Sequence, residues 1–379
     1  MVPQVITHLF PGRGATFKAR TFFVLKLTLV IIGLIAIAFA VYGIGPGGRF
    51  YFEIAKNPFR SFETAYWFHE SILHTILAYA LGFNHSHLSF SLFVLTFSPI
   101  TLLYLGLQID KRLPEGWVYF FLLVLTFHPL TLIHYTWVLH PDTFVALFTA
   151  VIFFSYSPTV IFVACVLGAL AHASQFLVIL LLSWLIRVTF EPDAISPIRL
   201  AAAGSIGWVV GKCLVLLYLT YFDIHIENTR LSIVMHPEWS LRVRQVLLNP
   251  WTTLYTLYAG YWLLIVALSY FAHRLSRRLF WAFLLSQIIA GTVTFVTYDT
   301  TRVFATLTWA PFIFCTVYVL NHLHGLSLGE GQMFRGILVG SLVLGILCPK
   351  LYSFNGAIWT MDETREYLQK VLKDAGSAQ

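Results

Sequence analysis

Two short polar segments in this apolar chain carry residues that could do acid–base or anion chemistry. His140 and Asp142 flank a proline, and Asp299 stands three residues before Arg302. A carboxylate beside an imidazole can act as a general base, and arginine grips phosphate through parallel hydrogen bonds. Structural roles fit as well, because Asp142 suits the first turn of a helix and an Asp299–Arg302 pair could be an interfacial salt bridge.

Further candidates lie in three other segments. His172 and Gln175 belong to the sequence AHASQ, which could hydrogen-bond a substrate or form a plain polar turn. Lys212 lies midway along an apolar run, so its ammonium needs a partner or a wet cavity. Glu53 and Arg49 share a segment of acids, bases and aromatic rings, which could contact a phosphate or sugar, or anchor the chain on lipid headgroups.

No metal site is predicted with any specificity. The sequence from His69 to His74 reads HExxxH, and this spacing places the two histidines on different faces of a helix, unlike the HExxH of zinc peptidases. The four cysteines show no CxxC spacing. A divalent metal therefore stays an open possibility without assigned ligands.

The elements that position these residues are those of a polytopic membrane protein. Of the 379 residues, 58% are hydrophobic and 11% are charged, whereas a soluble domain carries about 25% charged residues. The net charge of +7 comes without a basic run interleaved with aromatics, so nucleic acid is not an expected partner. Counting apolar runs of about 20 residues predicts an all-α bundle of about 11 spans in one membrane domain, residues 1–379.

Most of these runs predict simple spans, and one does not. The runs lie at 21–45, 86–107, 117–138, 141–156, 201–222, 251–271, 279–297, 303–320 and 336–349. The remaining stretch, 158–187, is too long for one span, so we predict two short helices, 158–171 and 174–187, that meet at AHASQ.

The alternation of spans predicts that the polar candidates gather on one side. Basic residues before the first span favour an N-terminus inside, and the lack of a sorting signal suggests a bacterial inner membrane. The outer segments are then 46–85, 223–250 and the tail 350–379, with an interfacial helix over 64–82. The candidate residues fall in these segments or in the outer parts of helices, apart from Lys212 midway along its run.

This layout resembles the GT-C superfamily of membrane glycosyltransferases, which use lipid-linked sugars. LAHAS at 170–174, followed after Gln175 by FLVILLL, is similar to the short helix pair with a central histidine in EpsG-like and Wzy-like polysaccharide proteins. The segment from Asp299 to Arg302 is similar to that group as well. One departure is clear: the DxD or ExD motif usual in the first outer loop is absent, and Glu53 stands alone there.

The resemblance implies transfer of a sugar from a polyprenyl-phosphate-linked donor on the outer face. Asp142, Asp299 or Glu53 would be the acid or base, and Arg302, His172, His140, Arg49, Gln175 and Lys212 would contact the substrate. Two other functions fit the same pattern. One is a transporter or flippase for a lipid-linked or anionic solute, and the other is a non-catalytic membrane subunit of a glycan assembly complex.

Overall fold

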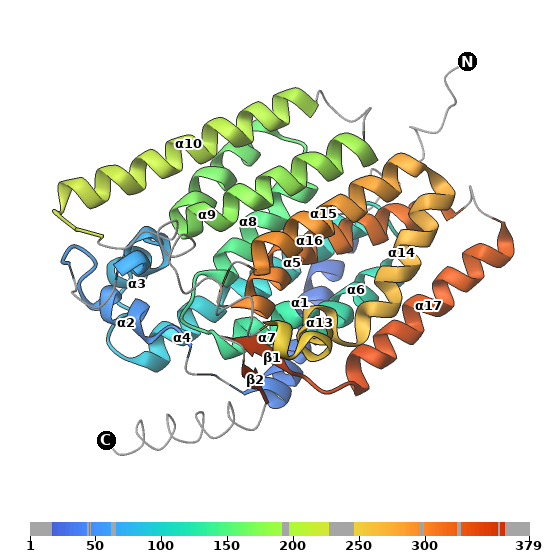
Figure 1. Ribbon diagram of the computed structural model, residues 1–379, viewed down its shortest axis with the longest axis horizontal. Helices are drawn as coiled ribbons and strands as arrows, with labels where there is room; N and C mark the ends of the chain where they lie inside the picture. The colour runs from blue at the N-terminus through green and yellow to red at the C-terminus, as the bar shows by residue number, and fades with distance from the viewer. Residues whose placement is uncertain are drawn as a thin grey trace.

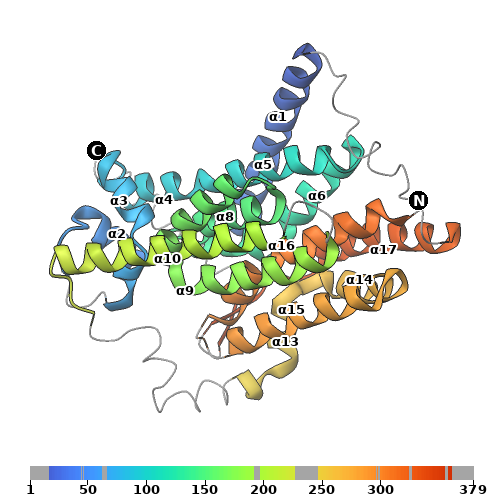
Figure 2. The ribbon, with the colours of Figure 1, turned by 90° about the horizontal axis from the view of Figure 1, so that it is seen from above.

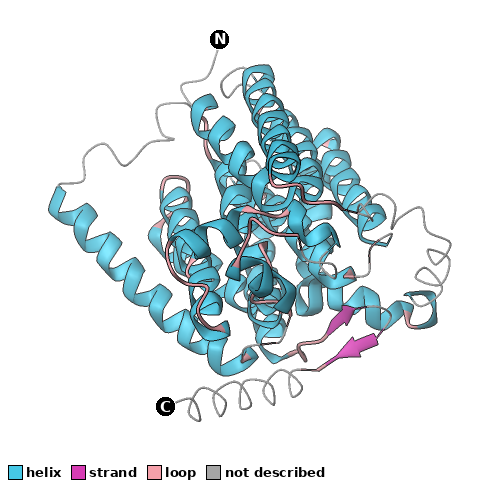
Figure 3. Ribbon diagram, turned by 90° about the vertical axis from the view of Figure 1, so that its left-hand side faces the viewer, coloured by secondary structure: helices cyan, strands magenta, loops and turns pink. Residues whose placement is uncertain are grey.

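The computed structural model describes residues 17–43, 45, 47–61, 66–191, 197–226, 246–295, 297, 299–323, 327–354 and 357–360. Within these ranges the chain is a bundle of helices with one small β-hairpin at its edge (Figures 1 and 3). The first half contains α1 (Phe17–Tyr42), α2 (Arg49–Lys56), η3 (Tyr66–Glu70), α3 (Leu73–Ala80), α4 (His87–Leu95), α5 (Phe97–Asp110), α6 (Glu115–Phe127), α7 (Pro129–Thr136), α8 (Asp142–Phe154) and α9 (Pro158–Phe190). The second half contains α10 (Pro197–Tyr221), α13 (Pro250–Tyr258), η4 (Ala259–Tyr261), α14 (Trp262–Leu275), α15 (Arg277–Phe295), α16 (Thr300–Asn321), α17 (Leu328–Leu347), β1 (Tyr352–Phe354) and β2 (Ala357–Trp359).

Eight helical segments of the described chain are long and apolar enough to cross a membrane, and the pair α6–α7, bent by 52°, makes a ninth if it counts as one span. The predicted multi-pass helical membrane protein is confirmed at this level. The prediction of about 11 spans counted in addition the short helix α8 and a second arm of α9. Helix α16 is the centre of the bundle, since 94% of the residues in its apolar 18-residue stretch are buried. Helix α1, in contrast, extends away from the rest (Figure 2).

Helix α9 is a helical hairpin rather than a straight rod. The backbone leaves helical geometry at His172, with φ −165° and ψ 83°. A Cβ added to Gly204 on α10 would lie within 4 Å of side-chain atoms of both Ile161 and Leu180, so these two residues lie close together. In a straight helix, residues this far apart in the sequence would be separated by about 28 Å. The predicted pair of short helices meeting at AHASQ is therefore confirmed.

The two ends of the bundle can be identified from α8. This helix begins at Asp142 and ends at Phe154, about 20 Å away at a rise of 1.5 Å per residue. The first arm of α9 follows directly and returns over a similar length, so the turn at His172 lies at the Asp142 end. Arg302 of α16 contacts Asp142, which places the start of α16 there as well. We call this the site end, and the end at Phe154 the far end.

The chain before α4 differs from the prediction of one interfacial helix over 64–82. The described part of this segment forms η3 and then α3, with a break between the two at Ser71 and Ile72. The Ile72 amide donates to the Leu170 carbonyl of α9 instead of continuing a helix, which is why the segment breaks there. Most of the predicted loop 223–250 and the tail beyond 360 lie outside the described residues.

The part of the tail that is described returns to the site end. Ser353 of β1 donates its amide to the Thr301 hydroxyl, and Thr301 donates to the Thr256 hydroxyl of α13. The Lys350 ammonium approaches the Gly345 and Phe127 carbonyls at the ends of α17 and α6. Residues 350–354 are thus part of the folded bundle, and residues 357–359 pair with them as β2.

Candidate functional site

Arg302 is the centre of a buried charge cluster at the site end. Its Nη1 lies 3.2 Å from Asp299 Oδ2 and 2.5 Å from His140 Nδ1, and its Nε lies 3.8 Å from Asp142 Oδ2. Asp142 is 1% exposed and His140 is 6% exposed. Four residues that the sequence singled out in two separate segments therefore form one cluster.

Helix ends position the two carboxylates. Asp142 is the first residue of α8, and Asp299 immediately precedes α16. The positive end of each helix dipole therefore lies near a carboxylate, which favours the charged form of both. Asp142 therefore has both of the roles considered for it, since it begins a helix and also belongs to the charge cluster.

A glycine and two aromatic rings pack closely against the His140 imidazole. Gly48 has a φ of +96°, and a Cβ at this position would lie 2.6 Å from His140 Cδ2, so only glycine fits without displacement. The rings of Tyr51 and Trp137 contact the imidazole edge-on, with centroids 4.9 Å and 5.1 Å away. Trp137 also lies under the Arg302 guanidinium at 5.7 Å. This packing fixes the imidazole and the guanidinium relative to the carboxylates.

The formal charge of the cluster is negative. Among these four described residues, two carboxylates face one guanidinium, and a neutral His140 adds nothing, so the sum for the four is −1. Ionised groups in an apolar bundle are costly unless they are paired or face a wet cavity, and they mark functional sites by default. The cluster is therefore suited to accept a proton or a positively charged group.

The predicted residues of the α2 segment lie apart from the cluster. Glu53 is half-exposed and pairs with Lys56 at 2.8 Å, three residues along the same helix. Arg49 is exposed and its guanidinium lies over the ring of Phe50. Neither contacts Arg302 in any interaction that the structure records, so the cluster forms without them.

A second polar group gathers at the tip of the α9 hairpin. His172 Nδ1 accepts a hydrogen bond from the Gln175 amide at 3.3 Å, and both side chains are buried. Trp208 of α10 donates its indole N–H to the Ala173 carbonyl. Lys212, one helical turn further, pairs with Glu70 of η3 at 3.4 Å, which supplies the partner that a lysine in this run requires.

Residues of η3 connect the two polar groups. The Phe68 ring lies 6.3 Å from His140, while Glu70 reaches Lys212. The centroid of the His74 ring lies 4.7 Å from that of Tyr51, which also packs against His140. Sequence reasoning did not select Tyr51, Phe68 or Trp137, because an aromatic residue in a chain with 34 phenylalanines carries no signal of its own.

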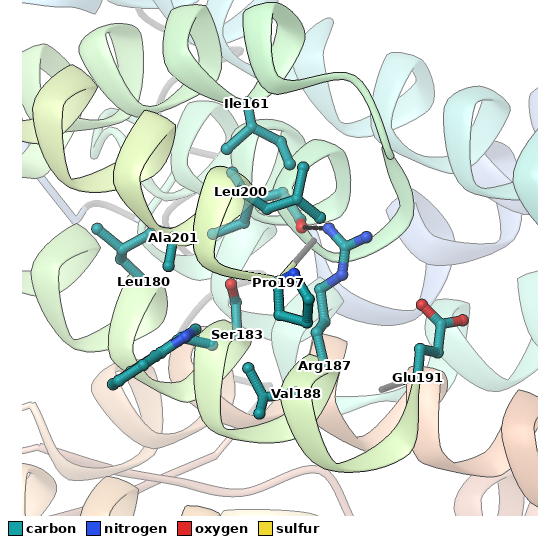
Figure 4. A pocket seen from close by; sticks show the side chains of 11 residues that line it. Ile161, Leu180, Ser183, Arg187, Val188, Glu191, Pro197, Leu200 and Ala201 are labelled. Carbon is teal, nitrogen blue, oxygen red and sulfur yellow. Dashed lines mark hydrogen bonds between the residues drawn. The ribbon is translucent and has the colours of Figure 1, made fainter. Parts of the chain in front are cut away.

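The far end holds a polar network that the sequence did not single out. Arg187 donates to the Ile152 and Ser155 carbonyls at 2.7 Å, and Arg112 donates to the Phe154 carbonyl, so both cap the end of α8. The Tyr156 hydroxyl links Arg112 to Glu191. Figure 4 shows Arg187 and Glu191 beside a cavity of about 30 Å³, which has room for about two water molecules.

The Arg302 cluster does not have the arrangement of a metal centre. Among the described residues, no group of three His, Cys, Asp or Glu side chains is placed to hold a metal ion. The Arg302 guanidinium occupies the space between the carboxylates of Asp142 and Asp299 that a cation would share. Compared with known proteins, the chain matches no family model, no curated protein and no solved structure.

Proposed function

We propose that this protein is a membrane glycosyltransferase that takes a sugar from a polyprenyl-phosphate-linked donor at the site end. The observation that carries the proposal is the Asp142 carboxylate, which is almost fully buried at the end of an apolar bundle and held beside Arg302 at 3.8 Å. An apolar bundle suits the lipid of such a donor, and a polar cluster at its end suits the sugar.

In the proposed reaction Asp142 is the general base. It takes the proton of an acceptor hydroxyl while the hydroxyl oxygen forms a bond to the anomeric carbon of the donor sugar. The bond between that carbon and the phosphate oxygen breaks, and the polyprenyl phosphate leaves with the electron pair. Uptake of one proton brings the formal charge of the cluster from −1 to 0.

Arg302 and Asp299 are given positioning roles. Arg302 contacts both carboxylates and His140, so its contacts support a counter-ion that orients Asp142. A contact between Arg302 and the phosphate of the donor stays a prediction, since a guanidinium has five N–H donors. No step is assigned to a metal, because Arg302 fills the space between the carboxylates.

Asp142→Asn is the sharpest test, since it keeps the shape and removes the base. We expect release of polyprenyl phosphate from a polyprenyl-phosphate hexose, in lipid nanodiscs, to fall by at least about 100-fold. The matched control is Asp223→Asn, whose carboxylate is 88% exposed. Wild-type turnover by Asp142→Asn at normal protein level would exclude the assigned role. Arg302→Ala is less informative, because it removes the guanidinium beside the buried Asp142 carboxylate, and loss of one partner of a buried ion pair destabilises a fold by about 3–5 kcal/mol.

Transport of a lipid-linked or anionic solute is the second candidate, and the far-end network favours it. A route across the membrane needs polar groups at both ends, and Arg112, Arg187 and Glu191 supply them opposite Asp142. Against it, Phe148 in the middle of α8 and Phe153 near its far end are both buried, so apolar side chains lie between the two polar groups. Movement of a fluorescent lipid phosphate between leaflets of protein-containing liposomes, with no sugar transfer, would make transport the better reading.

A further inference from the structure

Gln175 is a buried amide whose hydrogen-bonding capacity is unused. Its side chain lies at the tip of the α9 hairpin and is 5% exposed. Neither its amide nitrogen nor its amide oxygen has a hydrogen-bond partner among the described residues. A buried amide without partners is destabilising, so a native structure that keeps one calls for an explanation.

The backbone of the turn around Gln175 is hydrogen-bonded to neighbouring segments. The hairpin turn frees backbone carbonyls, and these are taken up by neighbours: the Leu170 carbonyl accepts from the Ile72 amide, and the Ala173 carbonyl accepts from the Trp208 indole. The Gln175 backbone amide donates to His172. Two other segments, the link before α3 and helix α10, thus bond to the turn, while both polar atoms of the Gln175 side chain lack a partner among the described residues.

The position of the turn relates it to the charge cluster. The first arm of α9 returns to the site end, and η3 with the residues after it lies between the two groups. Ile72 donates to Leu170 of the hairpin, Glu70 pairs with Lys212 of α10, and the Phe68 ring lies 6.3 Å from His140. Trp208 and Lys212 are four residues apart and share a face of α10. A substrate whose reacting carbon lies near Asp142 would therefore have its remaining polar groups on the side of the hairpin.

We propose that the Gln175 side chain hydrogen-bonds hydroxyl groups of the donor sugar and so selects a lipid that carries a sugar over the bare lipid phosphate. This inference rests on the proposed function. A primary amide offers two donors and one acceptor. A sugar hydroxyl both donates and accepts, so neighbouring hydroxyls can satisfy the amide nitrogen and oxygen together. The bare lipid phosphate is a monoester whose oxygens only accept once it is ionised above its second pKa of about 6, and a polyprenyl chain neither donates nor accepts.

The test compares two lipids and two variants. Gln175→Leu keeps the size of the side chain and removes its polar atoms, and Gln175→Met is a second variant in case leucine packs poorly. The matched control is Ser341→Ala on α17, which removes another buried side-chain oxygen that lacks a partner among the described residues. The probes are a polyprenyl-phosphate hexose and the corresponding polyprenyl phosphate, titrated by native mass spectrometry of the full chain.

We expect Gln175→Leu to raise the melting temperature without ligand, to bind the hexose lipid roughly tenfold more weakly, and to bind the bare lipid phosphate as the wild type does. Ser341→Ala should bind both lipids normally. Unchanged hexose-lipid binding by Gln175→Leu would overturn the inference and leave an amide satisfied by ordered water only. Equal weakening for both lipids would overturn it as well. A wild-type protein that does not prefer the hexose lipid would overturn the proposed function itself.

Discussion

Arg302 illustrates how a single residue acquires its role from its neighbours. Between Asp142 and Asp299 its guanidinium balances charge, whereas in a loop facing water the same residue would be an anion-binding group. The sequence alone allowed either role, an ion pair with a carboxylate or anion binding. The contacts support the first, because the charged groups recorded beside it among the described residues are carboxylates.

The buried histidines beside the site make stability depend on pH. Burial lowers the pKa of His69 to about 4 and the pKa of His74 to about 3, from an ordinary value of 6.5. Both are neutral in the folded protein at pH 7. As the pH falls from 6.5 towards 4, the unfolded chain takes up protons and the folded protein does not, so the free energy of unfolding decreases. The loss is on the order of 1.4 kcal/mol per pH unit for each histidine.

We therefore expect the melting temperature of the wild type to fall between pH 7 and pH 4.5. His74→Gln, which cannot be protonated, should flatten this dependence, and the exposed control His85→Gln should follow the wild type. A His74→Gln curve parallel to that of the wild type would show that His74 is protonated at little cost in the folded state.

Among the elements, the α9 hairpin depends on close packing against α10. A Cβ on Gly207 would lie 2.5 Å from the Phe162 carbonyl oxygen, and a Cβ on Gly211 would lie 2.6 Å from that of Val166. Small residues let helix backbones approach in membrane bundles, where no hydrophobic force drives helices together. The first arm of α9, which leads to His172, is therefore held against α10 by close backbone contacts. These contacts are possible only because residues 207 and 211 are glycines.

Gly207→Ala should destabilise the protein, since the clash involves backbone on both helices. Gly340→Ala on α17 is the matched control, because a Cβ there meets nothing within 4 Å and alanine favours helix by up to about 1 kcal/mol. We expect a lower melting temperature for Gly207→Ala and an unchanged or higher one for Gly340→Ala. Equal melting temperatures would mean that α10 can move away from α9 without loss.

For the whole molecule, the main feature is the separation of two polar ends by an apolar bundle. The Asp142–Arg302 cluster lies at one end of α8 and the Arg112–Arg187 network at the other. Phe153 and Phe314 pack against each other near the far end, and Phe148 in the middle of α8 is buried. A reaction confined to one membrane face fits this arrangement more directly than a continuous route does.

Cysteine labelling of intact cells tests the two ends. In a background without the four native cysteines, Arg49→Cys and Asp223→Cys at the site end should react with an impermeant reagent from one side. Lys111→Cys and Arg278→Cys at the far end should react only after permeabilisation, if the N-terminus is inside as the basic N-terminal residues predict. All four are exposed positions. Labelling of Arg49→Cys and Lys111→Cys from the same side would contradict the two-ended arrangement.

The sequence by itself determined the helical membrane class, the apolar runs, the break of 158–187 at AHASQ and the choice of His140, Asp142, Asp299 and Arg302. These follow from local hydropathy and from the high cost of charge in an apolar chain, which makes each exception conspicuous. Only the tertiary structure decided that the four residues form one cluster, that Glu53 pairs with Lys56 and that Lys212 pairs with Glu70. It also placed Tyr51 and Trp137 against His140 and built the far-end network. The reason is that such contacts join residues far apart in the chain, and helix packing, not local pattern, sets which helix ends meet.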